Sequence, residues 1–359
     1  MKNKKAICTL PIIFVLLFAA IPVNANNYTV KEAAQYAKKE ILIKEGIEGI
    51  SYTENPDKVI IYIENNEYEE IVPEKIKGYE TEIRVSGKFR LLNLEQETMS
   101  LEPLQFLKSR ESRWDPLIGG ISISRIGKPS GTLGIVFEEG SERYILSCAH
   151  VFAGKPPDYV PIGTEIVQPS SEHGGVDVVG HLYKYIDLDT SGFTADAALA
   201  KCTVDASINE ILDYDDESTY TVDIKKLYFP KVGDQVKKSG YNSGVTEGVV
   251  EDTHACIVVD TGGPWGYEIF EDQILVNSDF AIPGDSGSVV TQTTSPYRWA
   301  GLVWAGSISH WLAVCKASHI IKELGITAKS KPFDLVYDRF FEKFPNLFDL
   351  FKILTIKSK

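Results

Sequence analysis

The chain has 359 residues, 43% apolar and 24% charged, which is enough apolar material for a core and enough length for more than one domain. Its formal net charge of −13 argues against nucleic acid as a main partner, because phosphate binding requires a basic surface.

The first 25 residues have the pattern of a secretory signal peptide. Basic residues precede an apolar run from Ala6 to Val23, which ends in a Val-Asn-Ala cleavage site at 23–25. We therefore expect a secreted protein. The run is just long enough to span a bilayer, so an uncleaved membrane anchor is the alternative.

Residues 26–90 predict a small α+β domain. Helical periodicity runs from Thr29 to Lys44, and Thr29 with Glu32 has the pattern of a capping box. Strand-like stretches follow at 49–53, 58–64 and 81–85. Since this unit shows no catalytic constellation, it is either an inhibitory or folding-assisting prosegment or an accessory domain that stays attached. The charged residues 91–113 predict a linker.

From residue 114 to 326 the pattern changes to short strands separated by Gly, Pro and Asp, which favours an all-β barrel architecture. A helix is expected to close this domain at 318–325. The aromatic-rich residues 327–359 predict an amphipathic helical tail that Pro345 divides in two. The tail either docks on the protein or attaches it to a membrane surface or a partner.

Three motifs in this domain carry chemistry. Ser286 lies in Gly-Asp-Ser-Gly-Ser at 284–288, where the glycines permit a tight turn and the amides of Gly284 and Ser286 can form an oxyanion hole. His150 ends an apolar strand in Ser-Cys-Ala-His, and Asp196 opens the apolar run Asp-Ala-Ala-Leu. A serine hydroxyl needs such a base and orienting acid to become a nucleophile.

The order His150, Asp196, Ser286, with gaps of 46 and 90 residues, is close to the chymotrypsin spacing of about 45 and about 93. Residues 114–326 thus resemble chymotrypsin-like (trypsin-fold) serine peptidases of the bacterial type. The resemblance implies a mainly β fold with two antiparallel six-stranded β-barrels. It also implies a His-Asp-Ser triad that hydrolyses peptide bonds through an acyl-enzyme, without metal or other cofactor.

The resemblance extends to substrate binding. The stretch Gly301–Ser307 is similar to the strand on which substrates of this family pair in β fashion, which implies contacts at Trp304, Ala305, Gly306 and Ser307. Trp304 stands where the family usually has a serine that touches the catalytic acid. Counting back from Ser286 places Phe280 at the base of the specificity pocket, although Asp279 beside it leaves the preference open.

Two second-layer contacts are expected near the nucleophile. Asp285 is expected to form a structural ion pair or contact that sets the turn, with an internal arginine or a backbone group as its partner. Ser147 is expected to support Asp196 through a hydrogen bond.

Cysteines and the remaining histidines leave alternatives. Four cysteines follow the signal segment, and they either form two disulfides, with 148–202 and 256–315 as one of three pairings, or remain buried thiols: Cys148, Cys202, Cys256 and Cys315. His173, Asp177 and His181 have metal-ligand spacing, but neighbouring Gly and Val residues favour a loop and a strand, so we predict no metal site.

The function that the sequence favours is a secreted serine endopeptidase acting on proteins or peptides. Membrane contact is expected only through the signal segment or the tail. The alternative is a catalytically silent peptidase fold that serves as a binding or scaffold module.

Overall fold

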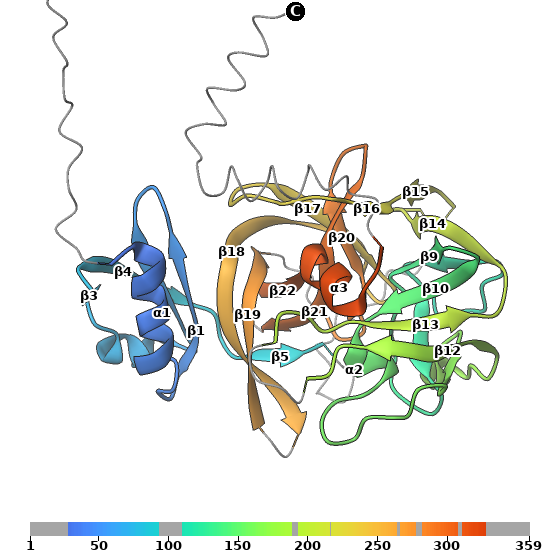
Figure 1. Cartoon of the computed structure of the whole chain (residues 1–359), viewed down its shortest axis with the longest axis horizontal. Coiled ribbons are helices and arrows are strands. Elements are labelled where there is room, and N and C mark those ends of the chain that lie inside the picture. The colour runs from blue at the N-terminus through green and yellow to red at the C-terminus, as the bar shows by residue number, and fades with distance from the viewer. Residues whose placement is uncertain are drawn as a thin grey trace, which may run out of the picture.

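The computed structural model describes residues 28–92, 110–188, 193–215, 217–263, 266–277, 282–307 and 311–327. The predicted signal peptide, most of the predicted linker, Phe280 and almost all of the predicted tail lie outside these ranges. Figure 1 shows a small N-terminal unit beside the long β18–β19 hairpin, with the green strands of the first barrel on the far side. None of the described helices is long and apolar enough to cross a membrane.

The N-terminal unit packs one helix on a small sheet. The capping box predicted at Thr29 and Glu32 is confirmed, and the helix buries Val30, Ala33, Ala34 and Ala37. The elements of this unit are α1 (Val30–Glu40), β1 (Ile47–Thr53), β2 (Lys58–Ile63), the 3-10 helix η1 (Asn66–Ile71), β3 (Lys75–Ile76) and β4 (Tyr79–Val85). The sheet order is β1-β2-β4-β3, in which β2 and β4 are parallel.

The first barrel is an antiparallel sheet in the order β8-β7-β11-β12-β13-β10-β9. Its strands are β7 (Ser122–Arg125), β8 (Gly131–Thr132), β9 (Ile135–Glu139), β10 (Glu142–Ser147), β11 (Glu165–Val167), β12 (Val178–Tyr185) and β13 (Ala198–Cys202). The backbone between β8 and β9 bonds to both sides, from Leu133 to Ile121 at 2.8 Å and from Gly134 to Leu146 at 2.9 Å. These bonds join β8 and β9 into one interrupted strand, which closes a six-stranded barrel.

The second barrel closes as the ring β17-β20-β21-β22-β19-β18, with β18 pairing back to β17. Its strands are β17 (Gln235–Gly240), β18 (Gly244–Gly263), β19 (Gly266–Asn277), β20 (Val289–Gln292), β21 (Arg298–Ser307) and β22 (Trp311–Lys316), followed by α3 (Ala317–Leu324). Both predicted six-stranded barrels and the predicted closing helix are therefore present.

Short elements connect the parts. They are β5 (Phe89–Leu91), β6 (Leu117–Gly119), α2 (Ala149–Phe152), the 3-10 helix η2 (Ser171–His173), β14 (Ala206–Leu212), β15 (Thr219–Thr221) and β16 (Asp223–Leu227). A small sheet, β15-β14-β6, joins β6, which precedes the first barrel, to β14 and β15, which follow it, and β16 pairs with β21.

The N-terminal sheet is continuous with the second barrel, which the sequence pattern does not reveal. The β18–β19 hairpin is much longer than its neighbours, and β1 pairs with β18 through Gly49 opposite Ile257 and Ile50 opposite Cys256. After β4 the chain runs back as β5, which lies between β18 and β21 and pairs with both (Figure 1). This return brings the end of the N-terminal unit to β21, the strand that contains the residues predicted to contact substrate.

Candidate active site

His150 and Asp196 are brought together by the pairing of two strands. In β10 and β13, Ser147 lies opposite Ala198, so the residues just beyond these strand ends share one end of the first barrel. His150 Nδ1 lies 2.5 Å from Asp196 Oδ2, and the His150 backbone amide donates to Asp196 Oδ1 at 3.1 Å. The His150 side chain is 6% exposed and Asp196 is fully buried. The carboxylate therefore holds both the ring and the backbone of this histidine.

Ser286 lies on a tight turn between residue 282 and β20. Gly284 and Gly287 have φ values of +99° and +95°, which favour glycine. A Cβ at Gly287 would lie 2.3 Å from Ser147 Oγ, so no side chain fits there. The turn is tied to both barrels, because Thr132 donates its amide to the Ser286 carbonyl and Gly287 donates to Val303, each at 2.8 Å.

The His150 and Ser286 segments meet across β8. Gly131 leaves no room for a side chain because Val151, the neighbour of His150, packs against it, and Thr132 bonds to Ser286. Within the described part of the chain, His150 Nε2 is buried without a hydrogen-bond partner. The three residues of the predicted triad thus lie at the junction of the barrels, and His150 Nε2 is the ring nitrogen that remains available to accept a proton.

The chain itself occupies this junction. Ser286 Oγ lies within hydrogen-bond distance of two carbonyl oxygens, that of Leu92 at 3.0 Å and that of Trp304 at 3.3 Å, which share its one proton. The Gly284 amide donates to the same Leu92 oxygen at 3.1 Å, and the Leu92 amide donates to Trp304 at 3.3 Å. Ser286 is fully buried. A residue of the predicted linker, Leu92, therefore covers the serine.

The strand that leads to Leu92 lies on the predicted substrate strand. In β5 and β21, Leu91 lies opposite Ala305, Arg90 opposite Gly306 and Phe89 opposite Ser307. The pairing is antiparallel. Residues predicted to bind an extended substrate thus bind an extended segment of this chain.

Asp285 is held by a buried lysine. Its carboxylate lies 2.9 Å from Lys238 Nζ and also accepts hydrogen bonds from Ser243 Oγ at 2.6 Å and the Ser243 amide at 3.2 Å. The predicted structural contact is confirmed, but its partner is a lysine rather than an arginine. Burial lowers the pKa of Lys238, and the adjacent Asp285 carboxylate opposes that shift. The signal in the sequence for this partner is a pair of adjacent lysines, Lys237 and Lys238, in the middle of the six-residue strand β17.

Two other expectations near the triad can be compared with the structure. The prediction for Ser147 is wrong, because its hydroxyl donates to the Thr132 carbonyl at 2.8 Å and not to Asp196. The buried Trp304 bonds through Nε1 to Gln273 at 3.0 Å, so its backbone carbonyl is the group that faces Ser286 and Leu92.

The residues with metal-ligand spacing have other partners. His173 lies 3.8 Å from Glu111, and Asp177 lies 3.3 Å from Arg113. His181 is exposed on β12. In the described ranges, the one group of three possible ligands that lies close together is Cys148, His150 and Asp196. Burial raises the pKa of Cys148 well above its usual value, so this thiol stays protonated and is a poor ligand.

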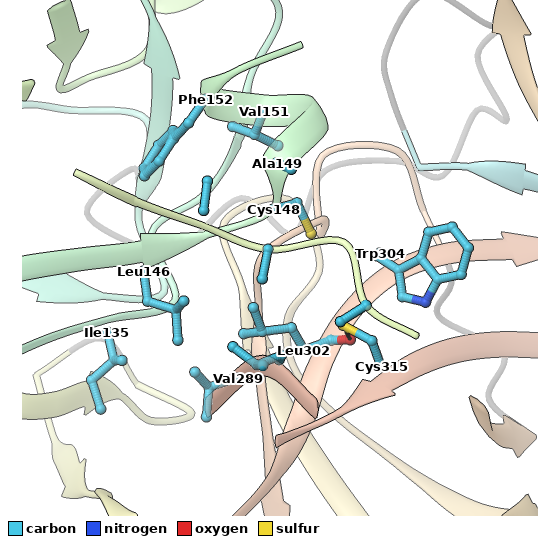
Figure 2. Close-up of a cluster of buried hydrophobic side chains, with 14 of the residues drawn as sticks. Ile135, Leu146, Cys148, Ala149, Val151, Phe152, Val289, Leu302, Trp304 and Cys315 are labelled. Atoms are coloured by element: carbon cyan, nitrogen blue, oxygen red, sulfur yellow. Dashed lines mark hydrogen bonds between the residues drawn. The ribbon is translucent and has the colours of Figure 1, made fainter. Parts of the chain in front are cut away.

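All four described cysteines are free thiols, which agrees with the second of the two alternatives, except that Cys202 is only half-buried. The strands separate the members of each predicted pair. Figure 2 shows Cys148 near the first barrel's Leu146, and Cys315 beside Leu302 of the second barrel. Cys148 Sγ donates to the Val303 carbonyl at 3.3 Å, which links the barrels directly behind the site.

Two six-stranded antiparallel barrels, with a His-Asp pair on the first and a Gly-Asp-Ser-Gly turn on the second, define the chymotrypsin-like serine protease fold. This chain has that fold, as its strand rings and the His150–Asp196 contact show.

Bacterial serine proteases are among the solved structures that match. Nocardiopsis protease (NAPase) is 15% identical with a TM-score of 0.41, and the match covers 58% of this chain and 96% of that one. Cellulomonas bogoriensis chymotrypsin is 14% identical with a TM-score of 0.41, covering 60% and 99%. A glutamic acid specific serine protease is 22% identical with a TM-score of 0.43, covering 58% and 98%. No family model and no curated protein matches the sequence.

Proposed function

We propose that the chain is a secreted serine endopeptidase that cleaves protein or peptide substrates. The observation that carries this proposal is the buried His150–Asp196 pair beside a serine whose hydroxyl and neighbouring amide already hold a peptide carbonyl. A binding module would have no need for a carboxylate that fixes a histidine through two bonds.

The roles follow from the contacts. Asp196 keeps the proton on His150 Nδ1, which leaves Nε2 as the base. When Ser286 Oγ attacks a substrate carbonyl, Nε2 takes its proton and later returns it to the leaving amine. The developing oxyanion is stabilised by the amides of Gly284 and Ser286, where one donor is typically worth about 3–4 kcal/mol.

Substrate would bind as an extended strand along Ala305, Gly306 and Ser307, where β5 pairs now. The backbone ladder supplies affinity irrespective of sequence, and side-chain pockets supply selectivity. Because β5 and a substrate need the same ladder, β5 must leave before another peptide binds.

A fluorophosphonate probe tests the chemistry, because it reacts only with an activated serine. The chain lacking residues 1–25 should be labelled, whereas Ser286→Ala and His150→Ala should not. His181→Ala is the matched histidine control, since this exposed side chain on β12 is remote from the pair with Asp196. The same variants should show parallel losses of activity on a denatured protein substrate.

Because β5 and Leu92 cover Ser286, a second labelling experiment is needed in which this strand is displaced. Phe89→Asp places a charge at a fully buried position of β5 and disfavours docking of this strand, so it should accelerate labelling. If neither the parent nor Phe89→Asp reacts while both remain folded, the endopeptidase proposal is refuted and a silent binding module becomes the better interpretation.

A further inference from the structure

Gln273 is a fully buried glutamine on β19 whose side-chain amide bonds to two segments of the site. Its Oε1 accepts a hydrogen bond from Trp304 Nε1 at 3.0 Å. Its Nε2 donates to the carbonyl oxygens of Thr194 at 2.9 Å and of Glu271 at 2.7 Å. Only this orientation of the amide fits, because an indole N–H can only donate and a backbone carbonyl can only accept.

The two distant partners of this amide flank the predicted triad from different barrels. Thr194 precedes the buried Asp196 by two residues, on the segment that enters β13 of the first barrel. Trp304 lies on β21 of the second barrel, and its carbonyl oxygen accepts the Leu92 amide at 3.3 Å and lies 3.3 Å from Ser286 Oγ. One side chain therefore joins the segment of the acid to the strand on which an extended peptide pairs.

Neighbouring contacts support this connection but do not replace it. The Glu271 amide donates to the Phe193 carbonyl at 2.7 Å, so two consecutive carbonyls, those of Phe193 and Thr194, are bound from β19. The Phe270 ring packs against Phe193 and Trp304, with ring centroids 5.3 and 3.9 Å apart. These aromatic contacts are non-directional, whereas the amide fixes the distance between the two segments.

The backbone beside Gln273 is strained in a way that aims its side chain. Asp272 has a φ of +57°, and the register of β18 and β19 shifts on both sides of Gln273. Irregularities of this kind re-aim a side chain, and a strained residue persists only where its surroundings hold it. Three basic groups from different elements hold the Asp272 carboxylate, namely Lys316 Nζ at 2.6 Å, His319 Nε2 at 2.7 Å and His254 Nδ1 at 3.1 Å.

We propose that Gln273 is a positioning residue for peptide hydrolysis, whose side-chain amide fixes the segment of Asp196 relative to β21 across the junction of the barrels. This inference rests on the proposed endopeptidase function and adds to it a residue that touches neither the substrate nor the reacting atoms. Without this amide, Asp196 would hold the His150 ring less exactly toward Ser286. The Trp304 carbonyl would also be displaced from the substrate amide that it accepts.

Gln273→Met tests this role, because methionine is similar in length and forms neither hydrogen bond. The variant is made in the chain lacking residues 1–25 with Phe89→Asp, so that β5 does not block β21. The rate of fluorophosphonate labelling should fall about tenfold, and kcat/KM for fluorescein-labelled denatured casein about a hundredfold. The loss is larger for casein because a peptide also needs the Trp304 carbonyl, whereas the small reagent does not.

Trp304→Phe separates the two ends of the amide. Phenylalanine keeps an aromatic ring against Phe270 but cannot donate to Gln273, and the bond from Gln273 to Thr194 remains. Labelling should stay within about threefold of the background, while KM for casein rises about tenfold with little change in kcat. Adding Gln273→Met should then give about the same kcat/KM as Gln273→Met alone, because the two changes remove the same bond.

Gln168→Met is the matched control. Gln168 is also a fully buried glutamine with backbone partners, since its Nε2 donates to the Ser112 carbonyl at 2.7 Å and its Oε1 accepts from the Trp114 amide at 3.0 Å. It follows β11 and bonds to neither segment of the site. In a Ser286→Ala background both methionine variants should lower the urea midpoint, but Gln168→Met should keep labelling and casein hydrolysis within about threefold of the background.

The outcomes separate this inference from the function on which it rests. If the Phe89→Asp chain is labelled and active but Gln273→Met changes neither rate, or if Gln168→Met reduces both as strongly, the positioning role is overturned and the endopeptidase stands. Should Gln273→Met not fold, an unchanged KM in Trp304→Phe overturns the role by itself. If Ser286 is labelled in neither the folded parent nor Phe89→Asp, both proposals fail.

Discussion

Replacing Lys238 by methionine is the sharpest test of how the nucleophile turn is held. Asp285 stands between Gly284 and Ser286, and its side chain is fully buried against Lys238, which is itself 3% exposed. Methionine keeps the length of the side chain but removes its charge. The carboxylate would then depend on the two hydrogen bonds from Ser243.

The expected effect is large because a buried charge loses its counter-charge. Breaking a buried ion pair by removing one partner typically costs about 3–5 kcal/mol. Since the bonds from Ser243 remain, we expect the lower end for Lys238→Met, about 3 kcal/mol in the free energy of unfolding. If the turn shifts enough to misplace one oxyanion donor, the reaction with fluorophosphonate should fall by a factor of about 10² to 10³.

Urea denaturation in a Ser286→Ala background measures the stability without interference from proteolysis, and labelling of the Ser286 form measures reactivity. Lys237→Met is the matched control. Lys237 is equally buried on β17, but it pairs with Asp213 at 3.1 Å, so its loss should lower stability and leave labelling largely intact. A double variant, Lys238→Met with Asp285→Asn, should recover much of the lost stability, because no buried charge is left unpaired.

The reasoning is refuted if Lys238→Met unfolds within about 1 kcal/mol of its parent and reacts normally, a loss well below that of a broken buried pair. Equal loss of labelling in the two single lysine variants would also contradict it, because the effect would then be general and not specific to Asp285.

Three further changes should give distinct results. Asp196→Asn should lower kcat by about 10⁴ with little change in KM, because the imidazole loses its correct tautomer, and steady-state kinetics checks this. Gly287→Ala should destabilise the fold by about 2 kcal/mol or more, since its φ is +95° and the added Cβ would lie 2.3 Å from Ser147 Oγ. The control Gly127→Ala also has a positive φ, but its added Cβ has no atom within 4 Å, so thermal denaturation should show a smaller loss of stability. Burial, and after it the negative charge of Glu64, raises the pKa of Glu48 to about 7. Between pH 4.5 and 7 the folded state therefore keeps a proton on Glu48 that the unfolded state has released. The unfolding free energy should therefore fall between pH 4.5 and about 7, and Glu48→Gln should flatten that fall in urea titrations; an unchanged slope would contradict this.

The elements that depend on neighbouring residues were predictable from the sequence. The capping box of Thr29 and Glu32 closes within one helical turn, and the strands of both barrels follow short apolar stretches bounded by turn residues. The triad residues were found because each lies at a strand end or turn in a short motif, and their order is informative. Their catalytic roles stay a prediction until the labelling experiment is done.

Contacts between distant segments were not predictable in the same way. The sequence called for a partner of Asp285, and the lysine pair inside β17 was a signal for one. It could not assign Lys238 to Asp285, because the two are 47 residues apart and meet only when β17 packs on the turn. Ser147 was expected to support Asp196, yet its hydroxyl donates to the carbonyl of Thr132, on a strand that comes earlier in the chain.

By itself, then, the sequence determined the two-barrel fold and the three residues that share its junction, because short-range periodicity and motif order carry that information. Only the tertiary structure decided that β1 pairs with β18 and that β5 pairs with β21, which places the Leu92 carbonyl against Ser286. A strand edge offers the same backbone donors and acceptors to any partner, so which segment pairs with it depends on where the folded chain brings that segment.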